Sequence, residues 1–433
     1  MNARAVSWFI RCAFGLLATI PALLAADRPN LLLICIDDLR PELPSFGQPH
    51  IHAPEMEKLF GQGRLFKQHY VQAPTCGASR YALLTGLRRN PELDTISNES
   101  FRRHDHASHP SFPALLRSHG YLTASIGKVS HYPGNRRGNQ WSDPKLLEIP
   151  NAWDQAVAAA AEWRSPLGLM HGYANGVGRK RGISPPFEAA TNARYPDDAI
   201  VDEFKIQLQR ASRQDKPWFI AVGLLRPHLP FACDQRFLDL YRNTEFPEIE
   251  HNSQPGPTKE WHASAELLNG YRCEHDPREN DSYAKQLRKF YAACVSSTDE
   301  HVGEILTALE KSGLSNNTIV VLWSDHGWHL GEHKIWGKHT LYPIALRSPL
   351  FIKSPGIKQA GTPSEEIVES VDVYPTLCHL THTPAPAGLD GQNLAPILAD
   401  PRRKSRGKAI SYWQDRMSII SKDGQQIVTR DAE

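Results

Sequence analysis

Short, continuously apolar runs alternate along this chain with longer stretches in which apolar residues return every three or four positions. Continuous apolar runs are typical of strands that are buried on both faces of a sheet. The spacing of three to four is typical of helices that bury one face. These patterns predict strands at residues 30–36, 121–126, 218–223 and 318–323, and helices at residues 54–60, 112–119, 197–211 and 290–311.

The alternation of strands and helices predicts an α/β fold, with a large mixed, mostly parallel sheet flanked by helices on both faces. Residues 141–196 and 247–280 are predicted to form long loops over the sheet. Such insertions often shape a pocket. Near the carboxyl end, residues 417–430 predict one hairpin around a Lys-Asp-Gly turn, and therefore a small antiparallel element.

The first 26 residues have the pattern of a signal peptide. Arg4 and Arg11 precede an apolar run at residues 12–24, and the small residues Ala25 and Ala26 follow. This run is shorter than the roughly 20 residues that cross a bilayer, so cleavage and export are predicted, with no membrane attachment afterwards. The expected location is the bacterial periplasm or the extracellular space, or the lysosome in a eukaryotic host. Export would permit disulfides among the remaining cysteines.

Charge and cysteine content exclude several classes of protein. The 433 residues include 49 basic and 47 acidic residues, for a net charge of +2. No long basic run is present, which argues against disorder and against a nucleic-acid partner bound through charge. Seven cysteines without paired spacing argue against a disulfide scaffold and against a structural zinc site.

Acidic residues follow two of the predicted strands. Asp37 and Asp38 come directly after the first, and Asp325 and His326 come just after the strand at residues 318–323. The carboxyl ends of parallel strands form the ligand site of such a sheet, so these side chains are expected to converge. Adjacent carboxylates repel each other unless a cation neutralises them, and oxygen ligands suit calcium or magnesium. In the simpler alternative, the first two aspartates only cap a turn.

Residues 74–86 read PTCGASRYALLTG. This string resembles the sulfatase signature, C-x-P-S-R followed by L-T-G, with Cys76 and Arg80 at the matching positions. In that family a formylglycine-generating enzyme oxidises the cysteine, and the hydrated aldehyde is the nucleophile. Ala78 replaces the proline of the signature, and its freer backbone could weaken recognition by that enzyme. A lone buried cysteine can also be a small hydrophobic residue.

The resemblance extends from about residue 28 to residue 380 and points to the iduronate-2-sulfatase branch. It rests on residues 28–41, 127–131 (GKVSH), 226–231 (RPHLPF), 324–333 (SDHGWHLGEH) and 336–338 (WGK). It implies an alkaline-phosphatase-like fold. The expected organisation is a signal peptide at residues 1–26, a catalytic domain at residues 27–385 and a short or truncated carboxyl-terminal subdomain at residues 386–433.

The resemblance also implies a role for each matching residue. One divalent cation would be bound by Asp37, Asp38, Asp325, His326 and the modified Cys76. In this family the cation is usually calcium. Lys128 and Lys338 would neutralise sulfate oxygens, and Arg80 would support the nucleophile. His131 would take a proton and His228 would protonate the leaving alcohol. The lysines could instead be surface charges, and the histidines could be structural.

The resulting expectation is a sulfuric ester hydrolase that removes sulfate from a sulfated saccharide. Two alternatives remain: a phosphate or phosphonate ester hydrolase of the same superfamily, and a non-catalytic glycan-binding homologue in which Cys76 stays a thiol. Four arginines in predicted loops could bind carboxylates or further sulfates of an anionic sugar, namely Arg136, Arg137, Arg179 and Arg181.

Overall fold

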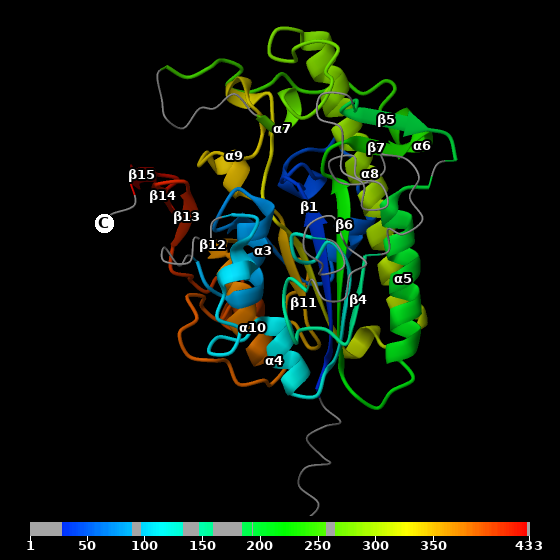
Figure 1. The fold of residues 1–433 in the computed structure, drawn as a ribbon, viewed down its shortest axis with the longest axis vertical. Coiled ribbons are helices and arrows are strands. Elements are labelled where there is room, and N and C mark those ends of the chain that lie inside the picture. Colours follow the sequence, from blue (N-terminus) through cyan, green and yellow to red (C-terminus); the bar gives the residue numbers. More distant parts are fainter. Residues whose placement is uncertain are drawn as a thin grey trace, which may run out of the picture.

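The computed structural model describes residues 28–88, 97–132, 147–158, 184–192, 194–256 and 265–430. The predicted signal peptide and the four loop arginines lie outside these described residues. A single eight-stranded sheet, in the order β12-β2-β11-β8-β1-β6-β3-β4, forms the centre of the structure (Figure 1).

This sheet is mixed and mostly parallel, as predicted. Only β11 runs antiparallel to its neighbours β2 and β8. The four strands predicted from apolar runs lie side by side in the middle of the sheet, whereas β2, β11 and β12 are shorter or more polar and escaped prediction. The strands are β1 (Asn30–Asp37), β2 (Arg64–Tyr70), β3 (Leu122–Gly127), β4 (Gln155–Val157), β6 (Trp218–Pro227), β8 (Thr318–Ser324), β11 (Leu350–Lys353) and β12 (Ser364–Glu369).

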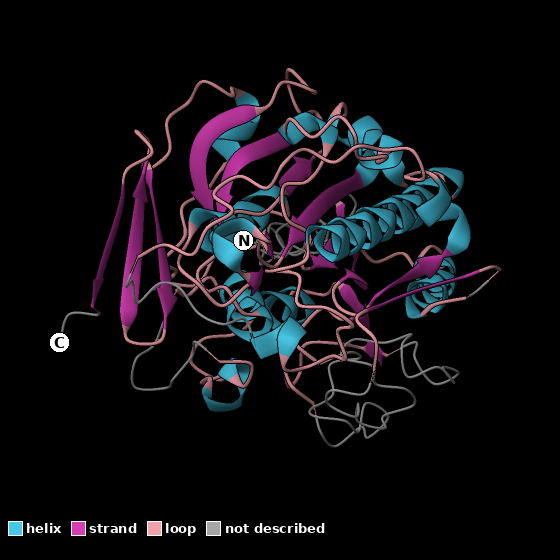
Figure 2. Cartoon of the chain, turned by 90° about the horizontal axis from the view of Figure 1, so that it is seen from above, coloured by secondary structure: helices cyan, strands magenta, loops and turns pink. Residues whose placement is uncertain are grey.

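Helices cover both faces of the sheet, because alternate residues of a strand point to opposite sides. On one face, Leu32 and Ile34 of β1 belong to a core with residues of α2, α5 and α8. On the other, Leu31 and Leu33 belong to a core with residues of α3, α4 and α10 (Figures 1 and 2). These helices are α2 (Pro54–Phe60), α3 (Cys76–Thr85), α4 (Phe112–Ser118), α5 (Pro196–Ala211), α8 (Asp281–Lys311) and α10 (Val373–Leu380).

Helix α8 is longer than the apolar pattern predicts. It begins at Asp281 rather than at residue 290, because the Asn280 side chain caps it by accepting a hydrogen bond from Tyr283 N at 2.9 Å. The predicted long loops also contain regular structure, including β4, β5 and α7. The smaller elements are β5 (Phe187–Ala190), β7 (Phe231–Asp234), β9 (His329–Leu330), β10 (Trp336–Gly337), α6 (Gln235–Asp239), α7 (Ala265–Leu268), α9 (Pro343–Leu346) and α11 (Ala395–Ala399).

The carboxyl-terminal element is a three-stranded antiparallel sheet rather than the single predicted hairpin. The hairpin of β14 (Arg416–Ser421) and β15 (Gln426–Arg430) is present, and β13 (Lys408–Trp413) pairs with β14 as a third strand. Tyr412 N donates to Gln72 O at 2.7 Å, so β13 packs against the segment that leads to Cys76. This contact supplies the packing that an isolated hairpin lacks.

Two findings relate to the predicted export: the state of the cysteines and the length of the helices. All six cysteines of the described residues are free thiols. Within the same part of the chain, no helix is long and apolar enough to cross a membrane.

Candidate active site

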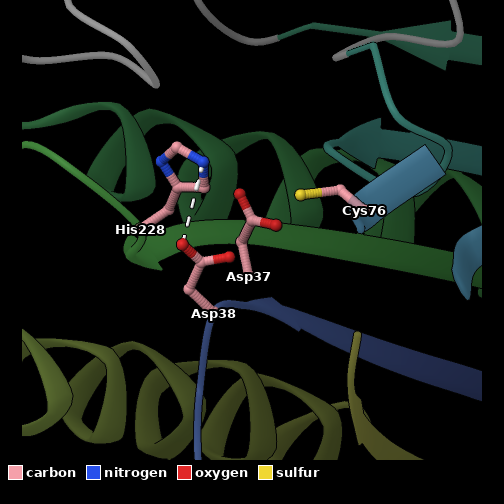
Figure 3. Close-up of side chains that lie close together, drawn as sticks. All are labelled: Asp37, Asp38, Cys76 and His228. Atoms are coloured by element: carbon pink, nitrogen blue, oxygen red, sulfur yellow. Dashed lines mark ion pairs between the residues drawn. The ribbon is translucent and has the colours of Figure 1, made fainter. Parts of the chain in front are cut away.

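Asp37 and Asp38 lie at the carboxyl end of β1 and are almost completely buried, with exposed fractions of 0% and 1%. Consecutive strand residues normally point to opposite faces. Here the pairing of β1 with β6 shifts register after Ile36, and Asp38 takes a left-handed φ of 61°. Both carboxylates therefore face one site, between His228 and Cys76 (Figure 3). Asp38 N also donates to Asp325 Oδ1 at 3.0 Å, which joins the ends of β1 and β8.

The structure brings all five predicted metal ligands together. One ligand atom from each of Asp38, Cys76, Asp325 and His326 lies within 4.8 Å of the others, and Asp37 joins a second such group with Asp38 and Cys76. His326 Nε2 is 3.4 Å from Asp38 Oδ1 and 3.6 Å from Asp325 Oδ2. Three buried carboxylates and one imidazole form a donor set that fits a hard divalent cation.

Cys76 is the first residue of α3. Its Sγ lies 3.4 Å from His326 Nε2 and 3.4 Å from Lys338 Nζ. Burial raises the pKa of the Cys76 thiol to about 12, although Lys128 and Lys338 oppose the rise. Burial therefore opposes formation of the thiolate, which is the nucleophilic form of cysteine.

Asn98 holds the amino end of α3 in place and was missed by the sequence analysis. Its Oδ1 accepts a hydrogen bond from Gly77 N at 2.9 Å. A Cβ at Gly77 would lie only 2.3 Å from Asn98 Cα, so this approach requires glycine. No motif signals the contact, because the two residues belong to separate local segments.

Two lysines form ion pairs with Asp37 and Asp38 at the carboxyl end of β1. Lys128 Nζ lies 2.5 Å from Asp37 Oδ2, and Lys338 Nζ lies 2.8 Å from Asp38 Oδ1. Burial alone would raise the pKa of Asp37, but Lys128, His228 and Arg80 hold it well below its usual range. Burial raises the pKa of Asp38 well above its usual range despite Lys338 and His326. Both lysines are buried in the site and are not surface charges.

Two glycines place Lys128. Gly127 has a φ of +67°, and a Cβ there would lie 2.3 Å from Gly223 O. A Cβ at Gly223 would in turn lie 2.0 Å from the Lys128 backbone. The chain can therefore cross close to β6, and Lys128 N donates to Gly223 O at 2.9 Å. This crossing brings the Lys128 side chain to the buried edge of the sheet.

Arg80 lies one helical turn after Cys76, and its guanidinium is directed at the aspartates. Nη2 lies 3.0 Å from Asp37 Oδ1 and 3.0 Å from Asp325 Oδ2. Nη1 donates to the carbonyl oxygens of Lys128 and Val129. Arg80 thus contacts two of the candidate metal ligands, Asp37 and Asp325.

His228 is fully buried beside the aspartates. Its Nδ1 lies 2.6 Å from Leu229 O, and its Nε2 lies 3.3 Å from Glu266 Oε1 and 3.8 Å from Asp38 Oδ2. Burial and Lys338 lower the pKa of His228 to about 4, although Asp37 and Glu266 oppose the fall. Glu266 was also missed by the sequence analysis, since it stands on α7 within a segment predicted to be loop.

His131 is 5% exposed. Burial and Lys128 lower its pKa well below the usual value. Glu148, a residue that the motifs did not include, accepts a hydrogen bond from Tyr132 N at 3.1 Å. Burial raises the pKa of Glu148 to about 7. The structure thus places His131 among buried ionisable groups next to Lys128.

Comparison with known proteins gives the family. Residues 29–383 match the family model described as Sulfatase. Iduronate 2-sulfatase of Mus musculus is 28% identical over 404 residues, covering 84% of this chain and 70% of the relative. A sulfatase of Formosa agariphila is 26% identical over 428 residues, covering 93% of this chain and 79% of the relative.

Solved structures confirm the alkaline-phosphatase-like fold. BT4656, in complex with its substrate D-glucosamine-2-N,6-O-disulfate, superposes with a TM-score of 0.68 at 21% identity, covering 93% of this chain and 91% of that chain. Phosphonate monoester hydrolase of Agrobacterium radiobacter has a TM-score of 0.70 at 20% identity, covering 93% and 89%. The family model spans most of this chain and includes every residue of the candidate site, so the chain belongs to the sulfatase family of sulfuric ester hydrolases.

Proposed function

We propose that this enzyme removes sulfate from a sulfated saccharide, using a formylglycine made from Cys76 and one divalent cation, calcium. The observation that carries the proposal is the position of Cys76 Sγ, 3.4 Å from both His326 Nε2 and Lys338 Nζ, in a cluster with Asp38 and Asp325. Metal ligands, cationic groups and the residue to be modified therefore surround one buried point.

Asp37, Asp38, Asp325 and His326 would hold the cation, with the modified side chain of residue 76. Their oxygen-rich set suits calcium, and the bound cation would stabilise negative charge on the sulfate oxygens. Arg80 forms ion pairs with two of these carboxylates, Asp37 and Asp325, and so holds them in place.

A formylglycine-generating enzyme is the partner that this proposal requires. Formylglycine supplies a hydrated aldehyde as the oxygen nucleophile, which the unmodified side chain of Cys76 cannot supply. In this chain, Ala78 stands where the signature has proline. The fraction of Cys76 that is converted to formylglycine is therefore the quantity to measure.

The remaining residues bind the sulfate and move protons. The ammonium groups of Lys128 and Lys338 would bind sulfate oxygens, where buried, preorganised cations stabilise charge effectively. His228 would donate a proton from Nε2 to the oxygen of the leaving alcohol, and His131 would take the proton whose removal lets residue 76 release the sulfate. Burial of all four side chains excludes bulk water from the reacting groups.

A saccharide substrate is supported by the relatives. One is named iduronate 2-sulfatase, and one structural neighbour holds a sulfated glucosamine as its substrate. The alternative is a phosphate or phosphonate ester, because a phosphonate monoester hydrolase shares the fold equally well. The sulfatase family match favours the sulfate ester.

We also propose the organisation expected from the sequence. Residues 1–26 would act as a signal peptide, residues 27–385 would form the catalytic domain, and residues 386–433 would form a short carboxyl-terminal subdomain. Export to the periplasm or extracellular space, or to the lysosome in a eukaryote, would follow.

Mass spectrometry and paired assays test the proposal. Protein coexpressed with a formylglycine-generating enzyme is digested, and the peptide that contains residue 76 is expected to carry an aldehyde in place of the thiol. The same protein should hydrolyse 4-nitrophenyl sulfate faster than 4-nitrophenyl phosphate, and should act on sulfated saccharides. Cys76→Ala, the matched control, should be inactive. A fully alkylatable Cys76 in active protein from the native host would refute the formylglycine, and faster phosphate hydrolysis would refute the sulfate specificity.

A further inference from the structure

Glu266 connects two of the groups assigned above to the sulfate ester. Its Oε1 lies 3.3 Å from His228 Nε2 and 3.3 Å from Lys338 Nζ. The Glu266 side chain is only 6% exposed. The next residue, Leu267, is 1% exposed in the core and anchors α7. A single, firmly held carboxylate oxygen therefore bridges an imidazole and an ammonium group.

The contacts of Lys338 show what this bridge does. An ammonium group has three donors. In this structure Lys338 Nζ lies 2.8 Å from Asp38 Oδ1, 3.3 Å from Glu266 Oε1 and 3.4 Å from Cys76 Sγ. These acceptors match the three donors and direct the ammonium group toward residue 76. Without the Glu266 carboxylate, Asp38 would be the dominant acceptor, and Lys338 would shift toward it.

The contacts of His228 lead to the same conclusion. Nδ1 lies 2.6 Å from Leu229 O, so Nε2 is the ring nitrogen that faces the site. Glu266 contacts that nitrogen and thereby limits rotation of the ring. A general acid must lie within hydrogen-bond reach of the atom that it protonates, and a displacement of about 1 Å can lower the rate by about 100-fold.

We propose that Glu266 is a positioning residue that holds His228 and Lys338 on the leaving-group side of residue 76, and so fits the enzyme to sulfate esters of weakly acidic alcohols such as sugar hydroxyls. The inference rests on the proposed roles of these two residues. When the S–O bond breaks, the oxygen of a weakly acidic alcohol takes the proton that Nε2 carries in the imidazolium form of His228, and the ring keeps the Nδ1 proton that faces Leu229 O. A nitrophenolate leaves readily without that proton, so its ester is insensitive to the placement of His228.

Glu266→Gln, which keeps the shape and removes the charge, tests the proposal in the calcium-loaded, formylglycine-bearing enzyme. With phenyl sulfate, whose phenol has a pKa near ~10, kcat is expected to fall about 10- to 100-fold at unchanged KM. With 4-nitrophenyl sulfate, kcat is expected to fall less than about 3-fold. On a His228→Ala background, Glu266→Gln should reduce kcat with phenyl sulfate by less than about 3-fold, as with 4-nitrophenyl sulfate, because only its contact with His228 affects the leaving group and its contact with Lys338 remains. Glu274→Gln, at an exposed carboxylate of the same segment, should change neither rate.

An equal fall of kcat with both esters would show a structural role and overturn the proposal. A rise in KM alone would show a substrate contact and would overturn it as well. If Glu266→Gln does not fold, Glu266→Asp, which keeps the charge but has a shorter reach, must show the same selective loss. A wild-type enzyme that carries the aldehyde yet hydrolyses neither ester would refute the proposed function, whereas a loss independent of the leaving group refutes only this inference.

Discussion

The guanidinium of Arg80 donates from Nη2 to Asp37 Oδ1 at 3.0 Å, and both side chains are completely buried. The same nitrogen lies 3.0 Å from Asp325 Oδ2, so a residue of α3 ties together the ends of β1 and β8. This contact holds two candidate metal ligands at a fixed spacing. Arg80 therefore attaches the helix that carries Cys76 to two of the candidate metal ligands.

Replacing Arg80 by lysine should weaken both the fold and the metal centre. A lysine cannot reproduce the planar fork that serves two carboxylates at once. Breaking such a buried ion pair costs about 3–5 kcal/mol, and loss of a residue that orients metal ligands lowers metal affinity about 10- to 100-fold. Urea unfolding and calcium titration measure the two effects for Arg80→Lys.

A matched control is Arg117→Lys. Arg117 pairs with Asp154 at 2.7 Å on the surface, where its side chain is 42% exposed. Exposed pairs contribute less than about 1 kcal/mol. Unchanged calcium affinity in Arg80→Lys would contradict the orienting role of Arg80.

Removing calcium should lower the melting temperature of the wild-type protein. A ligand that binds only the folded state at 100 times its Kd stabilises that state by about 2.7 kcal/mol. Differential scanning fluorimetry with a chelator, and then with excess calcium, should show this shift and its reversal. In Asp325→Asn, calcium should no longer raise the melting temperature. In Asp423→Asn, which changes an exposed turn, calcium should raise the melting temperature as in the wild-type protein. A calcium response that survives in Asp325→Asn would count against the ligand set.

Restoring the proline of the signature should increase conversion of Cys76. Position 78 lies in the first turn of α3, where backbone N–H groups have no partner within the helix, so proline removes no helical hydrogen bond there. In cells that contain a formylglycine-generating enzyme, Ala78→Pro should raise the fraction of aldehyde measured by mass spectrometry. Ala82→Pro, in the interior of the same helix, should instead destabilise the fold by about 3 kcal/mol or more. A lower aldehyde fraction in Ala78→Pro would contradict the prediction.

The carboxyl-terminal sheet should depend on Arg406 for its docking. Arg406 Nη2 lies 2.9 Å from Glu369 Oε2 and 2.5 Å from Asp372 Oδ1, and both carboxylates are buried. Arg406→Ala leaves these two charges close together without that cation, so a loss of about 2–4 kcal/mol is expected. Limited proteolysis should then cut near residues 400–408 faster. Arg402→Ala, whose side chain is 83% exposed, is the control and should leave the cleavage rate unchanged.

The ion pair of His301 and Asp198 should give stability that depends on pH. His301 Nε2 lies 3.2 Å from Asp198 Oδ1. Although burial opposes it, Asp198 raises the pKa of His301, and His301 lowers the pKa of Asp198. The imidazolium contribution is complete below the unfolded pKa of about 6.5 and is lost as pH rises through the higher folded pKa. The Asp198 contribution is lost as pH falls below about 4.

His301→Gln should therefore cost roughly 1 kcal/mol at pH 6 and much less at pH 8.5. Urea unfolding of both proteins at the two pH values isolates the effect, because other titrating groups cancel in the comparison. A cost that is the same at both pH values would show that the imidazole is neutral in the folded protein.

Local patterns were sufficient for the centre of the fold and for the aspartates of the candidate site, whereas the resemblance to the sulfatase family supplied its other residues. The continuous apolar runs correspond to β1, β3, β6 and β8, because strands covered on both faces need apolar side chains at every position. The strand-end rule predicted that Asp37, Asp38 and Asp325 would converge, because parallel strands end at one edge of the sheet. Both signals are local or depend only on topology, so a single sequence contains them.

Tertiary structure alone decided which residues outside the motifs support the site. The bond from Asn98 to α3 and the bridge from Glu266 to His228 and Lys338 join segments with no recognisable spacing between them. Strand β12, with glutamates at three of its six positions, pairs with β2 through tertiary packing rather than through an apolar run. Such contacts form only when the sheet brings distant segments together, because desolvated charges must find partners wherever the fold places them.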